Sequence, residues 1–124
     1  MGSFFLDLLS FEHETAVFEK DPRRLRFTYN TLRFTELEEI REFKPELVIN
    51  AVTVKYTIPA FKEVIPYLPK DCIISDISSV KTGLKEFYET TGMHYASTHP
   101  MFGPTFANLN QLSEENAIII NEGD

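Results

Sequence analysis

The sequence predicts an α/β fold built around a parallel β-sheet, and three patterns lead to that prediction. Two nearly continuous apolar runs, 46–52 and 71–76, are typical of strands buried on both faces of a sheet. Segments of helical length lie between and after them, with apolar residues spaced three or four positions apart. Strands that alternate with helices pair in parallel through right-handed crossovers, so we expect helices on both faces of the sheet. The 124 residues suffice for one domain.

The first third of the chain is the least regular part. Phe4, Leu8 and Phe11 share one stripe of a short helix. The segment 25–34 is ambiguous, because its start alternates like a strand and its middle resembles a turn. We expect a helix at 3–11, a strand at 15–19 that ends in an acid, a helical turn opened by Pro22 and a short strand at 32–34.

Later elements are better marked. Thr35 and Glu38 fit a capping box, Pro45 stops the helix that it opens, and Gly92 fits the position just past a later helix. We expect a helix at 35–43, a strand at 46–52, a helix beginning near Pro59, a strand at 71–76, a helix at 80–91, a brief strand at 94–97 and a last strand at 117–120.

Composition excludes several functional classes. A net charge of −7 and a pI near 4.9 argue against nucleic acid or an anionic membrane as the main partner. The chain has no apolar run long enough to span a bilayer. Cys72 fits a buried small hydrophobe, and the three histidines lack metal-ligand spacing, so we expect no metal. These patterns predict a soluble, cytoplasmic domain.

Two strand-to-turn junctions carry the candidate chemistry. His99 follows the brief strand at 94–97 and precedes a turn rich in Pro and Gly, so we expect a loop to present it. Ser79 follows the buried strand at 71–76. Sites in open α/β sheets form outside the carboxyl ends of the strands, so we predict that Ser79 lies close to His99. The alternative is that His99 is an ordinary structural histidine.

The two junctions together resemble a known family. Residues 74–81 (ISDISSVK) contain Asp-x-x-Ser-x-Lys, and residues 99–104 (HPMFGP) contain His-Pro-x-x-Gly. In this order and spacing they are similar to the motifs of prephenate and arogenate dehydrogenases of tyrosine biosynthesis. The resemblance covers almost the whole chain and implies one incomplete NAD-binding Rossmann domain over 1–124, a doubly wound parallel sheet truncated at its N-terminus.

The resemblance also implies where a dinucleotide binds. Gly2, followed by an apolar helix, is similar to the last glycine of Gly-x-Gly-x-x-Gly, while the preceding strand and glycines are absent from the sequence. Glu19 would contact the adenosine ribose, which favours NAD; the nearby cations leave NADP open, and a solvated strand-end acid is the alternative reading. The implied cofactor-binding residues are Gly2, Glu19, Ala51, Val52, Thr53 and Asp76.

The family reaction is an oxidative decarboxylation in which hydride passes to the nicotinamide and the ring becomes aromatic. His99 would accept the hydrogen bond of the substrate hydroxyl, and Ser79 would orient His99 or bond the same hydroxyl. The alternative for Ser79 is a cap for a helix that begins at Val80. Asp76 could instead satisfy loop amides, and Lys81 could pair with an acid on the helix surface.

Family members carry a further helical domain that forms a dimer and contacts the substrate carboxylates. We therefore expect a fragment that is inactive alone, from a parent that acts on prephenate or arogenate as a homodimer. Two other interpretations stay open. The parent could be another Rossmann dehydrogenase of small hydroxy acids, or the chain could be a non-catalytic nucleotide-binding module whose exposed gap associates with another chain.

Overall fold

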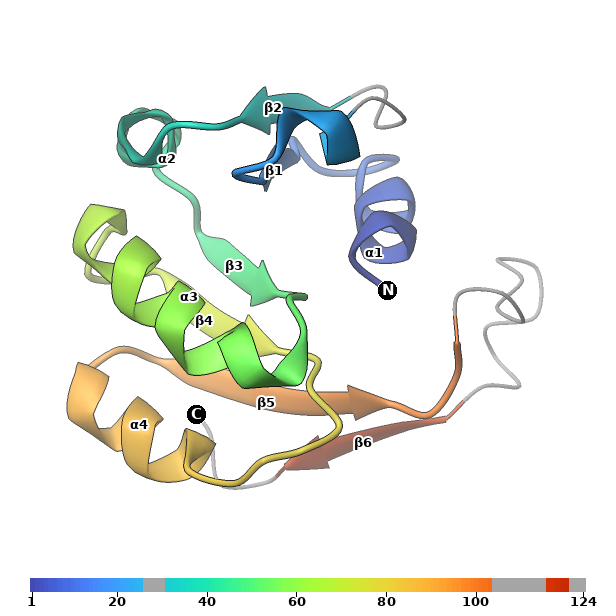
Figure 1. Cartoon of the computed structure of the whole chain (residues 1–124), viewed down its shortest axis with the longest axis vertical. Helices are drawn as coiled ribbons and strands as arrows, with labels where there is room; N and C mark the ends of the chain where they lie inside the picture. The colour runs from blue at the N-terminus through green and yellow to red at the C-terminus, as the bar shows by residue number, and fades with distance from the viewer. Residues whose placement is uncertain (26–30, 104–115, 121–124) are drawn as a thin grey trace.

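The computed structural model describes residues 1–25, 31–103 and 116–120, and it contains two separate sheets. In the first sheet, β1 (Ala16–Phe18) pairs in parallel with β2 (Leu32–Phe34). The second sheet has the order β3-β4-β5-β6 (Figure 1). Its strands are β3 (Leu47–Asn50), β4 (Ile73–Asp76), β5 (Tyr95–Pro100) and β6 (Ala117–Ile120).

The second sheet is parallel over three strands, as expected, and has one antiparallel strand at its edge. β3, β4 and β5 are parallel to one another, whereas β6 is antiparallel to β5. An antiparallel edge strand on an otherwise parallel sheet is common in doubly wound folds, because such a strand needs no helical crossover to reach its place.

The helices lie close to their predicted positions, with two differences at their amino ends. Glu36 and not Thr35 caps α2, because the Glu39 carboxylate accepts the backbone N–H groups of Thr35 and Glu36 at 3.1 and 3.0 Å. α4 begins at Leu84 after the left-handed Gly83, four residues later than predicted. The helices are α1 (Gly2–Leu9), α2 (Leu37–Phe43), α3 (Thr57–Val64) and α4 (Leu84–Thr91), with 3₁₀ turns η1 (Pro22–Leu25), η2 (Val54–Tyr56) and η3 (Ile65–Tyr67).

The hydrophobic core lies between α3, α4 and one face of the second sheet. Phe61 of α3, Ile74 of β4, and Leu84 and Tyr88 of α4 form its buried cluster. Ring contacts hold the layers together, with Tyr88 stacked on Tyr95 of β5 at 4.5 Å between centroids. This core fixes the position of β4 and β5 relative to α4, and therefore of the loop that joins them.

On the opposite face of the second sheet, three large apolar side chains are exposed, whereas Ser75 of β4 is buried. Side chains alternate along a strand, so Leu47, Ile73 and Ile119 point away from the face that carries Ile74. They are 48, 42 and 72% exposed. Within the described residues, none of the helices packs over these side chains as α3 and α4 do on the other face.

The two sheets are separated at the place where a central strand would stand. In Figure 1, β1 lies between β2 and β3, yet no ladder of described residues joins β1 to β3. One additional strand between them would complete the strand order of a doubly wound sheet. No helix among the described residues is both long and apolar enough to cross a membrane.

Candidate functional site

A row of buried polar residues crosses three neighbouring strands, at the carboxyl ends of β3 and β4 and in the middle of β5. Asn50 at the end of β3 lies in register with Asp76 of β4, which lies in register with Ser97 of β5. They are 9, 0 and 5% exposed. Buried polar groups need partners, so this row ties the loops that follow the strands to the sheet.

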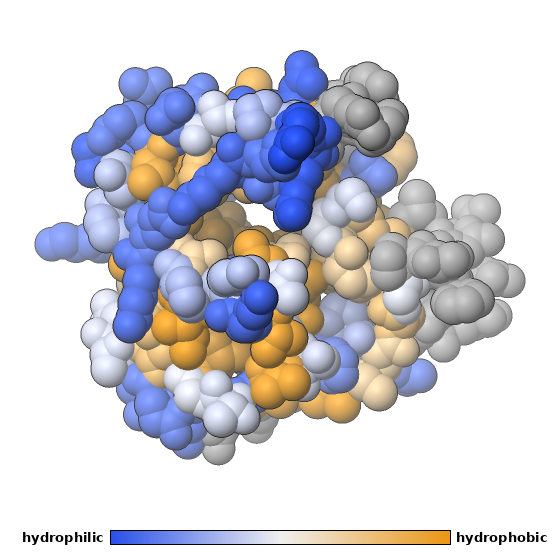
Figure 2. Space-filling view, viewed as in Figure 1, coloured by the Kyte–Doolittle hydropathy of each residue, from blue (hydrophilic) through white to orange (hydrophobic). Residues whose placement is uncertain are grey.

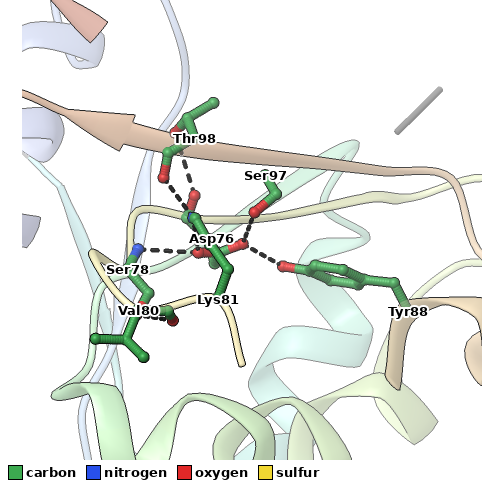
Figure 3. A network of polar contacts seen from close by, with 7 residues as sticks. All are labelled: Asp76, Ser78, Val80, Lys81, Tyr88, Ser97 and Thr98. Carbon is green, nitrogen blue, oxygen red and sulfur yellow. Dashed lines mark hydrogen bonds and ion pairs between the residues drawn. The ribbon is translucent and has the colours of Figure 1, made fainter. Parts of the chain in front are cut away.

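Asp76 is the centre of that row, and its carboxylate accepts four hydrogen bonds (Figure 3). Oδ1 accepts the hydroxyl groups of Tyr88 and Ser97, each at 2.7 Å. Oδ2 accepts the backbone N–H of Ser78 at 2.9 Å and the Lys81 ammonium at 2.5 Å. A buried carboxylate is tolerated when it is paired and fully hydrogen-bonded. These four bonds join Asp76 to α4, to β5 and to the loop after β4. They support the alternative that Asp76 satisfies loop groups and has a structural role.

Tyr88 anchors α4 to this carboxylate. Burial raises the pKa of its phenol well above the usual range, and the hydrogen bond to Asp76 and the negative charge there raise it further. The neutral hydroxyl therefore remains a donor at any physiological pH. Its bond fixes the distance between α4 and the end of β4.

Lys81 connects the Ser79 loop to the residue before His99, which corrects its predicted surface pairing. Its ammonium contacts Asp76 and also donates to the Thr98 carbonyl at 2.7 Å. The Thr98 hydroxyl in turn donates to the Asp76 carbonyl at 3.1 Å. The loop over 77–83 is thus fastened both to β4 and to β5. Because this loop is not helical, Ser79 is not a helix cap, and that alternative is wrong.

His99 lies within β5 and not in the loop that the sequence predicted. It pairs with Ile118 of β6, and its neighbour Pro100 is the last residue of the strand. Alternation along β5 puts the half-buried His99 on the face of Tyr95 and Ser97, which α4 covers. Ser79 is exposed in the loop that leads to α4. No hydrogen bond joins the two side chains among the described residues, so their direct contact stays a prediction. Pro104 lies outside the described residues.

Gly2 and Ala51 are brought together, as the predicted cofactor-binding set requires. A Cβ built at Gly2 would lie 3.1 Å from the Ala51 Cβ, closer than most real contacts of this kind. Glycine therefore lets the first turn of α1 approach the loop that follows β3. The loop itself is held by Asn50, which donates to the Thr57 carbonyl at 2.9 Å and accepts the Val52 N–H at 3.2 Å.

The same helix reaches the His99 side of the sheet. The ring of Phe4 on α1 meets the ring of Phe102 edge to face, with centroids 5.7 Å apart. Val52 and Thr53 are exposed beside this helix end, and the buried hydroxyl of Thr57 has no hydrogen-bond partner among the described residues. The first turn of α1, the loop after β3 and the end of β5 therefore meet at one edge.

Glu19 stands at the end of β1 with three cations around it. Its carboxylate accepts the Asp21 N–H at 3.1 Å and lies 3.7 Å from Arg24. Arg23 pairs with Asp21 at 2.8 Å, and Lys20 pairs with Glu63 at 2.6 Å. The Asp21 pKa is lowered, mainly by the hydrogen bond from Arg23. Each cation near Glu19 thus already faces an acid.

The sequence reasoning missed three residues of this edge. Asn50, Ser97 and Tyr88 were not selected, although all hold the loops or the hub in place. A usable signal was present for Asn50, because it ends an apolar strand with a polar residue, as Asp76 does. Tyr88 gave no signal beyond the helical stripe that placed it in the core.

Comparisons with known proteins agree with the motifs. Residues 13–120 match the model of the prephenate dehydrogenase nucleotide-binding domain. A probable arogenate/prephenate dehydrogenase of Methanocaldococcus jannaschii is 36% identical over 69 residues, which are 53% of this chain and 16% of that protein. The family match favours the first of the three interpretations drawn from the sequence.

Solved structures show the same Rossmann-like fold. Prephenate dehydrogenase from Aquifex aeolicus, in complex with hydroxyphenyl propionate and NAD+, superposes with a TM-score of 0.78 at 19% identity, over 99% of this chain and 48% of that one. Synechocystis arogenate dehydrogenase gives a TM-score of 0.67 at 18% identity, over 82% of this chain and 37% of that one. The chain therefore spans half or less of each of these proteins.

Proposed function

The chain belongs to the prephenate dehydrogenase family, as its nucleotide-binding domain, and we propose that it binds NAD for the oxidative decarboxylation of prephenate or arogenate. The observation that carries this proposal is the convergence of α1, the loop after β3 and the end of β5 at one edge of the sheet. Ligands of doubly wound sheets bind outside the carboxyl ends of the strands. Association as a homodimer and a cytoplasmic location remain predictions.

The residues at this edge fit a dinucleotide. The close approach at Gly2 keeps the amino end of α1 free of side-chain bulk, which suits a pyrophosphate near the first backbone N–H groups. Ala51, Val52 and Thr53 offer small side chains where the cofactor would pass. Asp76 is wholly buried, so we propose that it does not contact the cofactor directly but supports the loops that do. When bound, NAD would supply the hydride acceptor.

The charges around Glu19 support NAD in preference to NADP. A 2′-phosphate needs an uncommitted cation, whereas Lys20, Arg23 and Arg24 each already lie beside an acid. The Glu19 carboxylate would accept a ribose hydroxyl and repel a phosphate. Paired cations and one partly exposed acid therefore select the unphosphorylated ribose.

His99 and Ser79 would act on the substrate hydroxyl. A neutral imidazole can accept that hydrogen bond and take the proton as hydride leaves the same carbon. Ser79 would hold the imidazole or share the hydroxyl. The Asp76 hub supports both, because Lys81 fixes the Ser79 loop against Thr98, the residue before His99. This arrangement would support a base at the end of β5 and a hydroxyl in the adjacent loop.

Calorimetric titration with NAD+ and NADP+ tests the cofactor assignment. We expect NAD+ to bind at least about tenfold more tightly than NADP+, a difference of roughly 1.4 kcal/mol. Glu19→Gln should remove most of that preference, whereas Glu14→Gln, at an exposed acid five residues beyond the end of α1, should leave it unchanged. Equal affinities in the unmodified chain, or no binding to a chain that is folded by circular dichroism, would contradict the proposal.

Nuclear magnetic resonance tests the predicted pair. We expect Ser79→Ala to move the imidazole resonances of His99, and the matched change Ser3→Ala on the exposed side of α1 to leave them in place. Identical His99 resonances in both variants would show that Ser79 does not contact His99. That result would not affect the cofactor assignment, which the calorimetric titration tests independently.

A further inference from the structure

The backbone ladder between β4 and β5 ends at Asp76. The Ile74 N–H donates to the His94 carbonyl, and in a parallel ladder both backbone groups of every second residue face the same neighbour. Thr98, four residues after His94, therefore also directs its carbonyl toward the β4 side. In a longer ladder the donor to that carbonyl would be the Ser78 N–H. That N–H donates instead to the Asp76 carboxylate, at 2.9 Å.

Lys81 supplies the donor that the ladder lacks (Figure 3). Its ammonium donates to the Thr98 carbonyl at 2.7 Å and to Asp76 Oδ2 at 2.5 Å. The Lys81 side chain is 25% exposed, and that of Asp76 is wholly buried. Figure 2 shows hydrophobic residues gathered in the lower half of the view, where Figure 1 places α3 and the second sheet. The pair therefore lies in the more apolar part of the molecule, where weak solvation strengthens both bonds of the ammonium.

The two oxygens of the Asp76 carboxylate hold different parts of the molecule. Oδ1 accepts the hydroxyl groups of Tyr88 and Ser97, which belong to α4 and β5. Oδ2 accepts the Ser78 N–H and the Lys81 ammonium, which both belong to the loop after β4. The bonds of Oδ1 thus join a core helix to the sheet, whereas the bonds of Oδ2 hold the loop.

Ser79 lies between the two loop residues that Oδ2 holds. The Ser78 hydroxyl also donates to the Val80 carbonyl at 3.0 Å, so the backbone on both sides of Ser79 is fixed while Ser79 itself is exposed. Lys81 binds in addition the carbonyl of the residue before His99. Its ammonium is therefore the direct link between the loop of Ser79 and the strand of His99.

We propose that Lys81 is a positioning residue that sets the geometry between Ser79 and His99, while the Tyr88 and Ser97 bonds of the same carboxylate maintain the fold. A buried ion pair adds little stability relative to apolar residues of the same volume, but it can specify one arrangement. The inference rests on the proposed roles of Ser79 and His99 and is independent of the cofactor assignment.

A double-mutant cycle followed by nuclear magnetic resonance tests the positioning role. In the unmodified chain, Ser79→Ala should move the His99 imidazole resonances. In a Lys81→Met background, the same substitution should move them less than about half as far, because the loop is no longer tied to the strand. Lys62→Met, at an exposed lysine of α3, is the matched control background and should preserve the full change. An equal change in all three backgrounds would overturn the proposal.

Calorimetric titration with NAD+ separates this inference from the cofactor assignment. The Lys81→Met variant should bind NAD+ within about twofold of the unmodified chain, a difference of roughly 0.4 kcal/mol. Loss of NAD+ binding in that variant would overturn the positioning role, in favour of a part in the dinucleotide site. If Ser79→Ala leaves His99 unmoved in the unmodified chain, the positioning role is overturned and the NAD assignment is unaffected.

Tyr88→Phe tests the division between the two oxygens. It removes a donor to Oδ1 alone, so it should lower the urea unfolding midpoint and preserve the change that Ser79→Ala causes at His99. A change reduced as far as in Lys81→Met would overturn the division. If Lys81→Met does not fold, Asp76→Asn/Lys81→Met replaces it, with Asp76→Asn as the reference, because the double substitution leaves no unpaired buried charge.

Discussion

The part of the chain that contains the sheet β3–β6 and the part that contains β1 and β2 differ in how well their strands are packed. Three of the four residues of β4 are buried, and the strand pairs with β3 on one edge and β5 on the other. At its carboxyl end, the Asp76 carboxylate accepts four hydrogen bonds. Among the described residues of the amino-terminal part, from α1 to β2, Leu25 alone is buried, and neither α1 nor β1 contains a buried residue. The first region has a core and a polar hub, whereas the described residues of the second are joined by the β1–β2 ladder without a buried cluster.

The difference teaches which part of the site is preorganised. The loop of Ser79 and the strand of His99 belong to the held region, because Lys81 and Asp76 join them. Glu19 and the start of α1 belong to the loosely held region, which meets the rest through Gly2, Phe4 and Lys20. We therefore expect the catalytic edge to be more rigid than the dinucleotide edge.

The largest expected effect separates two phenylalanines. Phe61 is 1% exposed in the core of the held region, and Phe11 is 77% exposed beyond α1. Phe61→Ala should lower the free energy of unfolding by about 3–5 kcal/mol through lost burial and a residual cavity. Phe11→Ala should change it by less than about 0.5 kcal/mol. Urea unfolding followed by circular dichroism measures both, and similar losses would remove the distinction between the regions.

The next effect probes the polar hub. Asp76→Asn keeps the side-chain shape, but the neutral amide cannot accept all four donors or balance Lys81, so we expect a loss of about 2–3 kcal/mol. Asp71→Asn is the control, because Asp71 is an exposed acid just before the same strand. The measurement is the urea unfolding midpoint of each variant, compared with that of the unmodified chain. Equal midpoints would mean that the hub contributes nothing to the stability of the held region.

The third effect is a loss of stability at alkaline pH. Burial, with the nearby Asp71, raises the Cys72 pKa from 9.0 to about 11, and burial with the Asp76 bond raises the Tyr88 pKa further. Both groups keep their protons longer in the folded state, so their contribution is complete below about pH 9 and declines as pH rises. We expect a decline on the order of 1–2 kcal/mol by about pH 11.

Variants assign that decline to its groups. Cys72→Ala should flatten the slope between about pH 9 and 11, and Tyr88→Phe should flatten it above about pH 10. Tyr56→Phe is the matched control at a tyrosine that is 54% exposed, and its slope should equal that of the unmodified chain. A slope unchanged by the first two substitutions would place the titration elsewhere.

The sequence predicted the held region well and the boundaries of the site less well. The apolar runs around Val48 and Ile74 identified two strands, and the two motifs placed Ser79 and His99 at adjacent strand ends. Periodicity could not show that Asp76 would take Lys81 as a partner, because that contact depends on the loop after β4 and not on local pattern. It also could not show β6 as antiparallel, since strand propensity carries no direction.

The smallest expected effect concerns the ion pair between Lys20, after β1, and Glu63 of α3. The Lys20 and Glu63 side chains are 64 and 36% exposed, so solvent screens most of their attraction. Lys20→Ala should therefore cost less than about 0.5 kcal/mol, close to the cost of Arg41→Ala, which removes the exposed pair with Glu38 inside α2. A loss above about 1 kcal/mol for Lys20→Ala alone would instead show that this pair is a major link between the two regions.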